Sequence, residues 1–355
     1  MSNDPTTIGW KAPANIALVK YWGKRGHQLP DNGSLSMTLD KSATTTFLTW
    51  RGKSQPGNSL CMEYCFHGLR NLKFEQKVTG LLNNLKAAIP FLSDYELVFH
   101  SENNFPHSTG IASSASSMAA LALCLVTMEE QVTGKRVSPG QFFRRASGIA
   151  RFGSGSASRS IYGGIVTWGE IPSVDGTSDE YATPFPLPAG SRYVRLRDII
   201  LIVRTKEKSI SSSSGHSLMN GHPYKAGRKL QADENLKKIM EAIHACDYRT
   251  IAVIAENEAL SLHALLLSSQ NGEILLHPNT LRIIEAIRQF RNQSGLDLFF
   301  TIDAGPNVHL IYFDDQREAI RSFVEQELVQ YCENGLWIDD KIGTGPVPIL
   351  PKTKN

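Results

Sequence analysis

The stretch Asn103–Ser117 reads NNFPHSTGIASSASS and runs directly into the apolar segment MAALALCLV, residues 118–126. Glycine and small hydroxyl side chains let backbone N–H groups approach a bound anion closely, and a helix N-terminus favours negative charge. The stretch therefore indicates a phosphate-binding loop that leads into a buried helix, although it lacks the G-x-x-x-x-G-K-[ST] pattern of a Walker A motif. Composition alone leaves open a second interpretation, a flexible serine-capped loop before a core helix.

The bulk composition restricts the class of protein. A chain of 355 residues is long for one core, so two domains are expected. A formal net charge of +3 without a long basic run gives no sign of nucleic-acid binding. Apolar runs such as Met118–Met128 are shorter than the ~20 residues that span a bilayer. The start MSNDPTTIGW lacks the pattern of a secretion signal, and five scattered cysteines fit reduced thiols, so we expect a cytoplasmic protein with no membrane partner.

Strand and helix patterns alternate irregularly along both halves of the chain. Period-two alternation of apolar residues predicts strands, and apolar faces at helical spacing with capping signals predict helices. The predicted strands are 16–19, 35–39, 44–50, 59–68, 95–102, 165–170, 198–205 and the pair within 296–315; the predicted helices are 74–88, 115–130 closed by Gly134, 139–153 capped by Ser138, 236–243, 283–290 and 316–334. Without strict βαβ alternation, this order favours an α+β fold.

The domain division follows composition. Residues 172–190 are rich in Pro, Gly, Ser and Asp, as in a surface connection. We therefore expect an N-terminal domain over 1–190, a C-terminal domain over 191–340, and a tail over 341–355.

Three further stretches could carry chemistry. In APANIALVKYWGKR (12–25), Lys20 shares a strand face with Leu18, so it points either into a cleft or from a solvated edge strand. In GSGSASRSIYGG (153–164), the guanidinium of Arg159 could bind a carboxylate or phosphate, or could satisfy loop carbonyls. In TIDAGPNVHL (301–310), Asp303 ends an apolar strand and is either a general base or a turn former.

Taken together, the motifs NIALVKYWGKR, LPDNGSLSMTLD, NNFPHSTGIASSAS, GSGSASRSIYGG and TIDAGPNVHLI closely resemble the diphosphomevalonate decarboxylases of the GHMP kinase superfamily. The resemblance runs from about Trp10 to about Asp315, and looks nearer to bacterial members than to the animal enzyme. It implies the GHMP kinase fold, with an N-terminal ribosomal S5 domain 2-like domain and a C-terminal ferredoxin-like domain. The active site would lie in the cleft between these domains.

The resemblance also implies a reaction. ATP would phosphorylate the tertiary 3-hydroxyl of (R)-5-diphosphomevalonate, and loss of that phosphate with carbon dioxide would leave isopentenyl diphosphate. ATP is then a co-substrate, magnesium is expected with it, and the partner is a small-molecule substrate in a homodimeric enzyme. The sequence does not mark the magnesium ligands.

Site roles follow residue by residue from the resemblance. Asp303 would accept or orient the proton of the 3-hydroxyl, Lys20 would lie in the same pocket, and Arg159 would bind the substrate carboxylate. The other substrate-binding residues implied are Tyr21, Lys24, Ser154, Gly155, Ser156 and Ser212, and the ATP-binding residues implied are Pro106, Ser108, Gly110, Ala112, Ser113 and Ser114.

Three departures from the family pattern affect substrate preference. Ser213 stands where some bacterial members have arginine, and His216 replaces a residue that is often methionine. The segment after Arg25 is short, so we expect the loop before Pro30 to close differently. The alternatives are a 5-phosphomevalonate decarboxylase, a mevalonate 3-kinase, or a non-catalytic GHMP-fold binding protein. Because the chain keeps both Asp303 and Lys20, decarboxylation is favoured.

Overall fold

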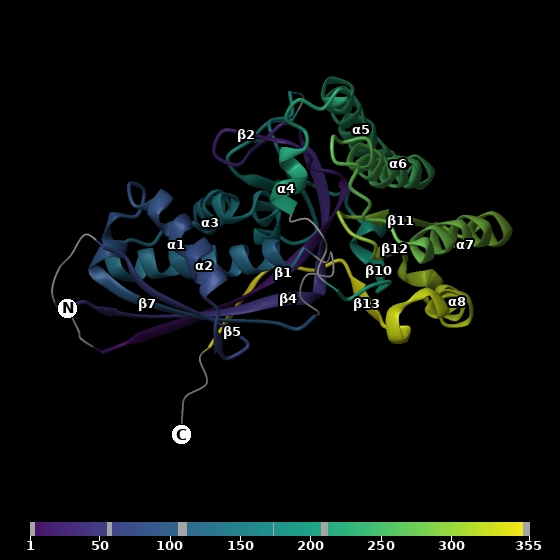
Figure 1. Cartoon of the computed structure of the whole chain (residues 1–355). Helices are drawn as coiled ribbons and strands as arrows, with labels where there is room; N and C mark the ends of the chain where they lie inside the picture. The colour runs from purple at the N-terminus through teal and green to yellow at the C-terminus, as the bar shows by residue number, and fades with distance from the viewer. Residues whose placement is uncertain (1–3, 55–58, 106–111, 173, 207–211, 351–355) are drawn as a thin grey trace.

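A computed structural model gives the architecture (Figure 1), and it describes residues 4–54, 59–105, 112–172, 174–206 and 212–350, with only the backbone of Ser212 and Ser213. The described chain forms one large sheet in its N-terminal half and a four-stranded sheet in its C-terminal half. The helices of the first half cover one face of the large sheet, and those of the second half lie beyond the smaller sheet, except for the short helix α4 (Ser212–Ser217), which lies beside the first half. The fold is the mixed α and β arrangement of two halves that the sequence predicts.

Two long antiparallel strands form the centre of the first sheet. β1 (Thr6–Val19) pairs with β4 (Ser34–Gly52) over almost its whole length. The order β14-β1-β4-β7-β5-β6 is antiparallel except at β5 and β7, and β8 joins the first part of β4. The shorter strands are β5 (Cys61–Phe66), β6 (Leu69–Arg70), β7 (Tyr95–Asn103), β8 (Ile165–Trp168) and β9 (Ala182–Pro184), with a separate hairpin of β2 (Lys24–Arg25) and β3 (Leu29–Pro30).

The N-terminal helices begin and end close to the predicted residues. They are α1 (Leu72–Leu85), α2 (Ser113–Thr133) and α3 (Pro139–Gly153), followed by the 3₁₀ helix η2 (Gly155–Ile161). A capping box at Ser138 begins α3, and Gly134 in the left-handed conformation ends α2. α2 is buried from Ala115 to Val126, as expected of a core helix.

The C-terminal sheet has the order β11-β12-β10-β13 and is antiparallel throughout. Its strands are β10 (Leu196–Leu201), β11 (Leu298–Ile302), β12 (Val308–Phe313) and β13 (Trp337–Lys341), and its helices are α4 (Ser212–Ser217), α5 (Lys225–Ala245), α6 (Tyr248–Leu267), α7 (Pro278–Ser294) and α8 (Arg317–Phe323). Short 3₁₀ helices lie at Pro90–Asp94, Arg192–Arg195 and Asp314–Gln316.

Two predicted segments differ from the structure. The α-helical part of the last helix ends at Phe323, and a π-helical turn at Val324–Leu328 and a 3₁₀ turn at Val329–Tyr331 continue it. The helical path then ends, because Cys332 is extended and Asn334 has a φ of 54°. The connection 172–190 contributes β9, which pairs with β8.

The two halves pack through a common hydrophobic cluster, and the end of the chain adds a strand to the first sheet. Ile16 and Leu18 of β1 pack in one cluster with Leu236 and Phe299 from the second half. Beyond the predicted C-terminal domain, β14 (Val347–Ile349) adds an edge strand beside β1 in the first sheet, within the segment expected to be a tail. β1 is therefore in contact both with the second half of the chain and with its C-terminal strand.

In the part of the chain that the structure describes, one helix, α6, is long and apolar enough to cross a membrane. Its most apolar window is 61% buried inside the structure, as in the core helix of a globular protein.

Candidate active site

The pair Lys20–Asp303 joins the two halves of the molecule. Lys20 follows the end of β1, and Asp303 follows the end of β11. Lys20 Nζ lies 2.7 Å from Asp303 Oδ1, and the side chains are 2% and 28% exposed, respectively. Burial lowers the pKa of Lys20, while the Asp303 charge opposes that shift. The solvated edge-strand interpretation of Lys20 is therefore wrong.

Arg159 lies buried in η2, and its guanidinium interacts electrostatically with the Asp303 carboxylate. Its Nη1 donates to Ser34 Oγ at 2.6 Å, and its Nε donates to Asn15 Oδ1 at 3.3 Å. Burial lowers the pKa of Arg159 to about 10, so the guanidinium stays charged at neutral pH. Within the described ranges, no carboxylate forms an ion pair with Arg159. A buried cation held by neutral groups fits a carboxylate ligand.

Tyr21 lies next to Lys20 and presents a buried hydroxyl. In the described part of the chain, its Oη has no hydrogen-bond partner. A Cβ built on Gly155 would lie 2.9 Å from this Oη and 2.8 Å from the Trp168 ring, so glycine is required for the close approach. Because an unsatisfied buried hydroxyl costs about 1–3 kcal/mol, Tyr21 fits a role in ligand binding.

Serines connect the start of α2 with η2. Ser114 Oγ lies 3.4 Å from Ser154 Oγ, which lies 3.4 Å from Ser156 Oγ. Ala112 directly precedes α2 with a φ of +47°, a conformation that costs energy for a residue with a side chain. Ser113 begins the helix, so the described part of the expected ATP loop faces the expected substrate serines.

Four expected site residues are not placed by the structure. Pro106, Ser108 and Gly110 lie outside the described residues, and the side chain of Ser212 is not described. Their assigned roles stay predictions.

The Lys24 charge influences a lysine on another element. Loss of hydration lowers the pKa of Lys24, whose Nζ donates to Gln28 Oε1 at 3.1 Å. The pKa of Lys77, on α1, is also lowered, by loss of hydration and, as a minor cause, by the Lys24 charge, although Lys77 is an exposed residue whose charge water screens. Both lysines can offer positive charge to an anionic ligand. Sequence analysis missed Lys77, because a lysine on an amphipathic helix gives no signal of its own.

His216 packs against the segment 21–23, which includes the expected substrate contact Tyr21. Its Nδ1 accepts a hydrogen bond from the Gly23 N–H at 3.1 Å, and its ring centroid lies 4.3 Å from that of Tyr21 and 4.7 Å from that of Trp22. The departure from the family pattern at this position therefore lies beside an expected diphosphate contact.

Asn15 is a second residue that sequence analysis missed. It is buried in β1, and its Nδ2 donates to Ser156 O at 3.1 Å and to Ser160 Oγ at 2.7 Å. Because its Oδ1 also accepts from Arg159, Asn15 fixes η2 against β1. The signal in the sequence is a single amide within the otherwise apolar run that contains Ile16.

Magnesium has no protein cage in the described ranges, where no three His, Cys, Asp or Glu side chains cluster. Mg²⁺ commonly uses few protein ligands and several phosphate or water oxygens. The site is thus compatible with a magnesium ion that arrives with a nucleotide.

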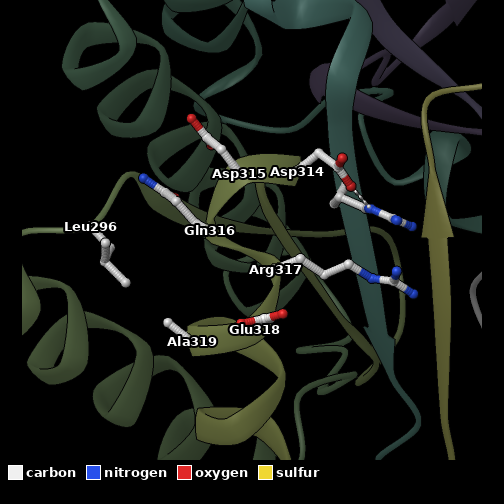
Figure 2. Close-up of a pocket in the computed structure, with 8 residues that line it drawn as sticks. Leu296, Asp314, Asp315, Gln316, Arg317, Glu318 and Ala319 are labelled. Atoms are coloured by element: carbon white, nitrogen blue, oxygen red, sulfur yellow. Dashed lines mark hydrogen bonds and ion pairs between the residues drawn. The ribbon is translucent and has the colours of Figure 1, made fainter.

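A charged hollow of about 570 Å³ lies elsewhere, on the C-terminal half (Figure 2). It is lined by Arg197, Leu296, Asp314, Asp315, Gln316, Arg317, Glu318 and Ala319. These residues lie where β11 begins and β12 ends, whereas Asp303 follows the opposite end of β11. The hollow is therefore not part of the candidate active site.

Comparisons with known proteins agree with this geometry. A model of the diphosphomevalonate decarboxylase-like N-terminal domain matches residues 12–180, and one of the mevalonate 5-diphosphate decarboxylase C-terminal domain matches residues 198–340. The diphosphomevalonate decarboxylase of Gibberella zeae is 32% identical over 86% of this chain and 80% of its own length; that of Rattus norvegicus is 30% identical over 86% and 76%.

Solved structures match over almost the whole chain. A mevalonate diphosphate decarboxylase from Staphylococcus aureus superposes with a TM-score of 0.82 at 29% identity, covering 98% of this chain and 99% of that one. A structure named as MDDEF in complex with MVAPP, AMPPCP and magnesium gives 0.81 at 29% identity over the same shares.

Among curated relatives, fungal and vertebrate proteins match at 29–32% identity, so the expected closeness to bacterial members is not supported. The expected fold is confirmed. The chain belongs to the diphosphomevalonate decarboxylase family and has its GHMP kinase fold.

Proposed function

We propose that this chain catalyses the ATP-dependent decarboxylation of (R)-5-diphosphomevalonate to isopentenyl diphosphate, with release of ADP, phosphate and carbon dioxide. The observation that carries the proposal is the Lys20–Asp303 pair, which lies beside the buried guanidinium of Arg159. Relatives named for this activity, and a structure named for its complex with MVAPP, AMPPCP and magnesium, support it.

Asp303 would act on the substrate hydroxyl. Its carboxylate is partly exposed, whereas the Lys20 ammonium behind it is buried. The 3-hydroxyl would donate its hydrogen to Asp303 while its oxygen attacks the terminal phosphoryl group of ATP. Lys20 holds the carboxylate in place and offsets its charge, as a preorganised electrostatic partner does.

Arg159 would orient the leaving carboxylate. Once the 3-oxygen carries a phosphoryl group, the C3–O bond breaks with its electron pair, and positive charge develops at C3. The bond from C2 to the carboxylate then supplies the electrons of the new double bond, and carbon dioxide departs. A planar guanidinium can bind that carboxylate through two hydrogen bonds and fix its orientation.

ATP would bind at the loop that ends in Ala112, Ser113 and Ser114, together with Pro106, Ser108 and Gly110. Backbone amides at the start of α2 favour phosphate oxygens. Magnesium bound with ATP neutralises phosphate charge during transfer. In the part of the site that the structure describes, the hydroxyls of Ser113 and Ser114 are the protein oxygens offered there, rather than a carboxylate cluster.

The substrate diphosphate would lie near Tyr21, Lys24 and Lys77. Lys24, which is partly buried, and Lys77, which is exposed, offer positive charge, and the Tyr21 hydroxyl offers a donor. We propose that Ser154, Gly155, Ser156 and Ser212 complete the substrate site. His216, packed on Tyr21, would adjust the preference for this diphosphate over a monophosphate.

A substrate panel tests the function. Mevalonate, its 5-phosphate and its 5-diphosphate are each supplied with ATP, and ADP and carbon dioxide are both measured. One carbon dioxide per ADP on the 5-diphosphate supports the proposal, whereas the same yield only on the 5-phosphate identifies a 5-phosphomevalonate decarboxylase. ADP without carbon dioxide indicates a 3-kinase, and nucleotide binding without turnover indicates a binding protein.

The remaining proposals concern the state of the protein. We propose a cytoplasmic homodimer, with domains over 1–190 and 191–340 and without nucleic-acid or membrane partners. Sedimentation equilibrium tests the oligomeric state, because a monomer at micromolar concentration would contradict it.

A further inference from the structure

The backbone of Lys20 is held from both sides by an ion pair that comes from the other half of the chain. Arg228 on α5 and Glu258 on α6 are 4% and 0% exposed. Glu258 Oε2 accepts the backbone N–H of Lys20 at 2.8 Å, and Arg228 Nη2 donates to the backbone carbonyl of Lys20 at 3.0 Å. Both backbone groups of this one residue are thus bound by charged side chains.

The ion pair itself is bidentate. Arg228 Nη1 lies 2.7 Å from Glu258 Oε1, and Arg228 Nη2 lies 2.7 Å from Glu258 Oε2. A paired geometry fixes the positions of both side chains more strictly than a single contact does. Because burying two charges costs free energy that apolar residues would not cost, stability alone gives little reason for this pair.

The helix that carries Glu258 also contacts the residue opposite Lys20. His263 of α6 lies with its Nε2 3.1 Å from the backbone carbonyl of Asp303. A carbonyl only accepts, so Nε2 carries the hydrogen and donates it. Burial lowers the pKa of His263 to about 4, which keeps the ring neutral at physiological pH. One helix therefore binds the backbone of both members of the Lys20–Asp303 pair.

We propose that Glu258 and Arg228 are positioning residues that hold the backbone of Lys20, so that its ammonium meets Asp303 in the reactive geometry. The inference rests on the proposed roles of Lys20 and Asp303. Glu258 and Arg228 touch neither substrate in this scheme; they act through Lys20. Since reacting groups displaced by about 1 Å can lose about 100-fold in rate, the positioning has a measurable kinetic effect.

The first test compares two carboxylates on α6. Glu258→Gln removes the charge that holds Lys20, and Glu256→Gln is the matched control. Glu256 is 5% exposed and pairs with Arg288 at 3.1 Å and with Arg291 at 2.5 Å, and within the described ranges it makes no hydrogen bond or ion pair with Lys20.

We expect Glu258→Gln to lower kcat about 10- to 100-fold while KM for each substrate changes less than about threefold. Glu256→Gln should keep kcat within about twofold, although its Tm falls. A Glu258→Gln enzyme with kcat within about twofold of the parent overturns the proposal.

A second variant separates positioning from folding, because Glu258→Gln leaves the Arg228 guanidinium buried without its partner. The double variant Glu258→Leu with Arg228→Met removes both charges, and such replacements often preserve stability. We expect a Tm close to that of the parent and the same loss in kcat. Loss of folded protein in both variants, while Glu256→Gln folds, would assign the pair a structural role and overturn the proposal.

A double-mutant cycle shows whether Glu258 acts through Lys20. In a Lys20→Met background, Glu258→Gln should cost less than about threefold in kcat, since the ammonium that it positions is gone. Full additivity of the two losses overturns the proposal. The experiment also distinguishes failure of the positioning proposal from failure of the roles assigned to Lys20 and Asp303. If those roles were wrong, Lys20→Met or Asp303→Asn alone would retain near-parental turnover.

Discussion

Two charged regions lie at opposite ends of β11, and they differ in their access to water. At one end, Lys20 and Arg159 are buried beside Asp303. At the other end, the hollow in Figure 2 carries Arg317 and Asp315, whose side chains are 39% and 57% exposed. The residue types are the same, so the types alone do not distinguish a reactive site from a solvated surface.

The pKa shifts show the physical difference. Burial lowers the pKa of Arg159 to about 10, whereas hydrogen bonding to Asp339 raises the pKa of Arg317. In the buried region, charges lose hydration and depend on specific partners, which makes each of them sensitive to a new anion. In the hollow, the side chains of Asp314, Asp315 and Arg317 are 39–57% exposed, so water screens these charges and their ion pairs contribute little. We therefore expect the reactive site where charges are desolvated, rather than where charged residues are most numerous.

The largest effect should come from Asp303→Asn. The amide cannot accept the hydroxyl proton, so we expect kcat to fall by about 1,000-fold or more. Nucleotide affinity should change less than about threefold, because the ATP loop is not altered. Turnover assays and equilibrium binding of an ATP analogue measure both quantities. Turnover close to that of the parent would rule out the proposed role of Asp303. It would also contradict the assignment of the buried region as the active site.

Arg159→Lys should have the next largest effect. An ammonium keeps the charge but cannot reproduce the planar fork that orients a carboxylate, so we expect about a 100-fold loss in kcat. The ratio of carbon dioxide to ADP is the more specific measurement. Poor orientation of the carboxylate should slow decarboxylation more than phosphorylation, so this ratio should fall. An unchanged rate and ratio would count against the proposed contact.

The dependence of protein stability on acid pH tests whether His263, which contacts the backbone of Asp303, is buried in its neutral form. The pKa of His263 is about 4 in the folded state against 6.5 for an unperturbed histidine. Between these values the unfolded chain binds more protons, so the free energy of unfolding falls as pH drops from about 6.5 to about 4. Each pKa unit is worth about 1.4 kcal/mol, so His263 contributes on the order of 3 kcal/mol to that loss.

The matched variant for this effect is His263→Gln, whose amide can still donate to the Asp303 carbonyl. Urea unfolding at pH 7 and at pH 4.5 should show a smaller acid-induced loss in the variant than in the parent. An equal loss in both proteins would mean that His263 is not buried in its neutral form.

The smallest effect is expected in the exposed hollow. Asp315→Asn removes an ion pair with Arg192 in which both side chains are about half exposed. We expect kcat within about twofold of the parent and a change in unfolding free energy below about 0.5 kcal/mol. A loss in kcat above about tenfold would show that the hollow affects the candidate active site. The two regions would then not differ in function as proposed.

Local patterns predicted much of the fold. Ser138 and Pro139 predicted the start of α3 because a capping box depends on neighbouring residues alone. The final helix was mispredicted because an apolar pattern does not reveal the extended Cys332 or the left-handed Asn334. Lys77 and Asn15 were missed because their partners lie on other elements.

The sequence by itself determined the family, the order of the motifs and the residue types of the candidate site, since these are properties of short segments. Only the tertiary structure decided which alternative holds for Lys20, because the end of a strand becomes a buried cation only when another half of the chain covers it. It also decided that Glu258 and Arg228 bind the backbone of Lys20. Contacts between residues more than 200 positions apart depend on how the two sheets pack, and no local pattern encodes that packing.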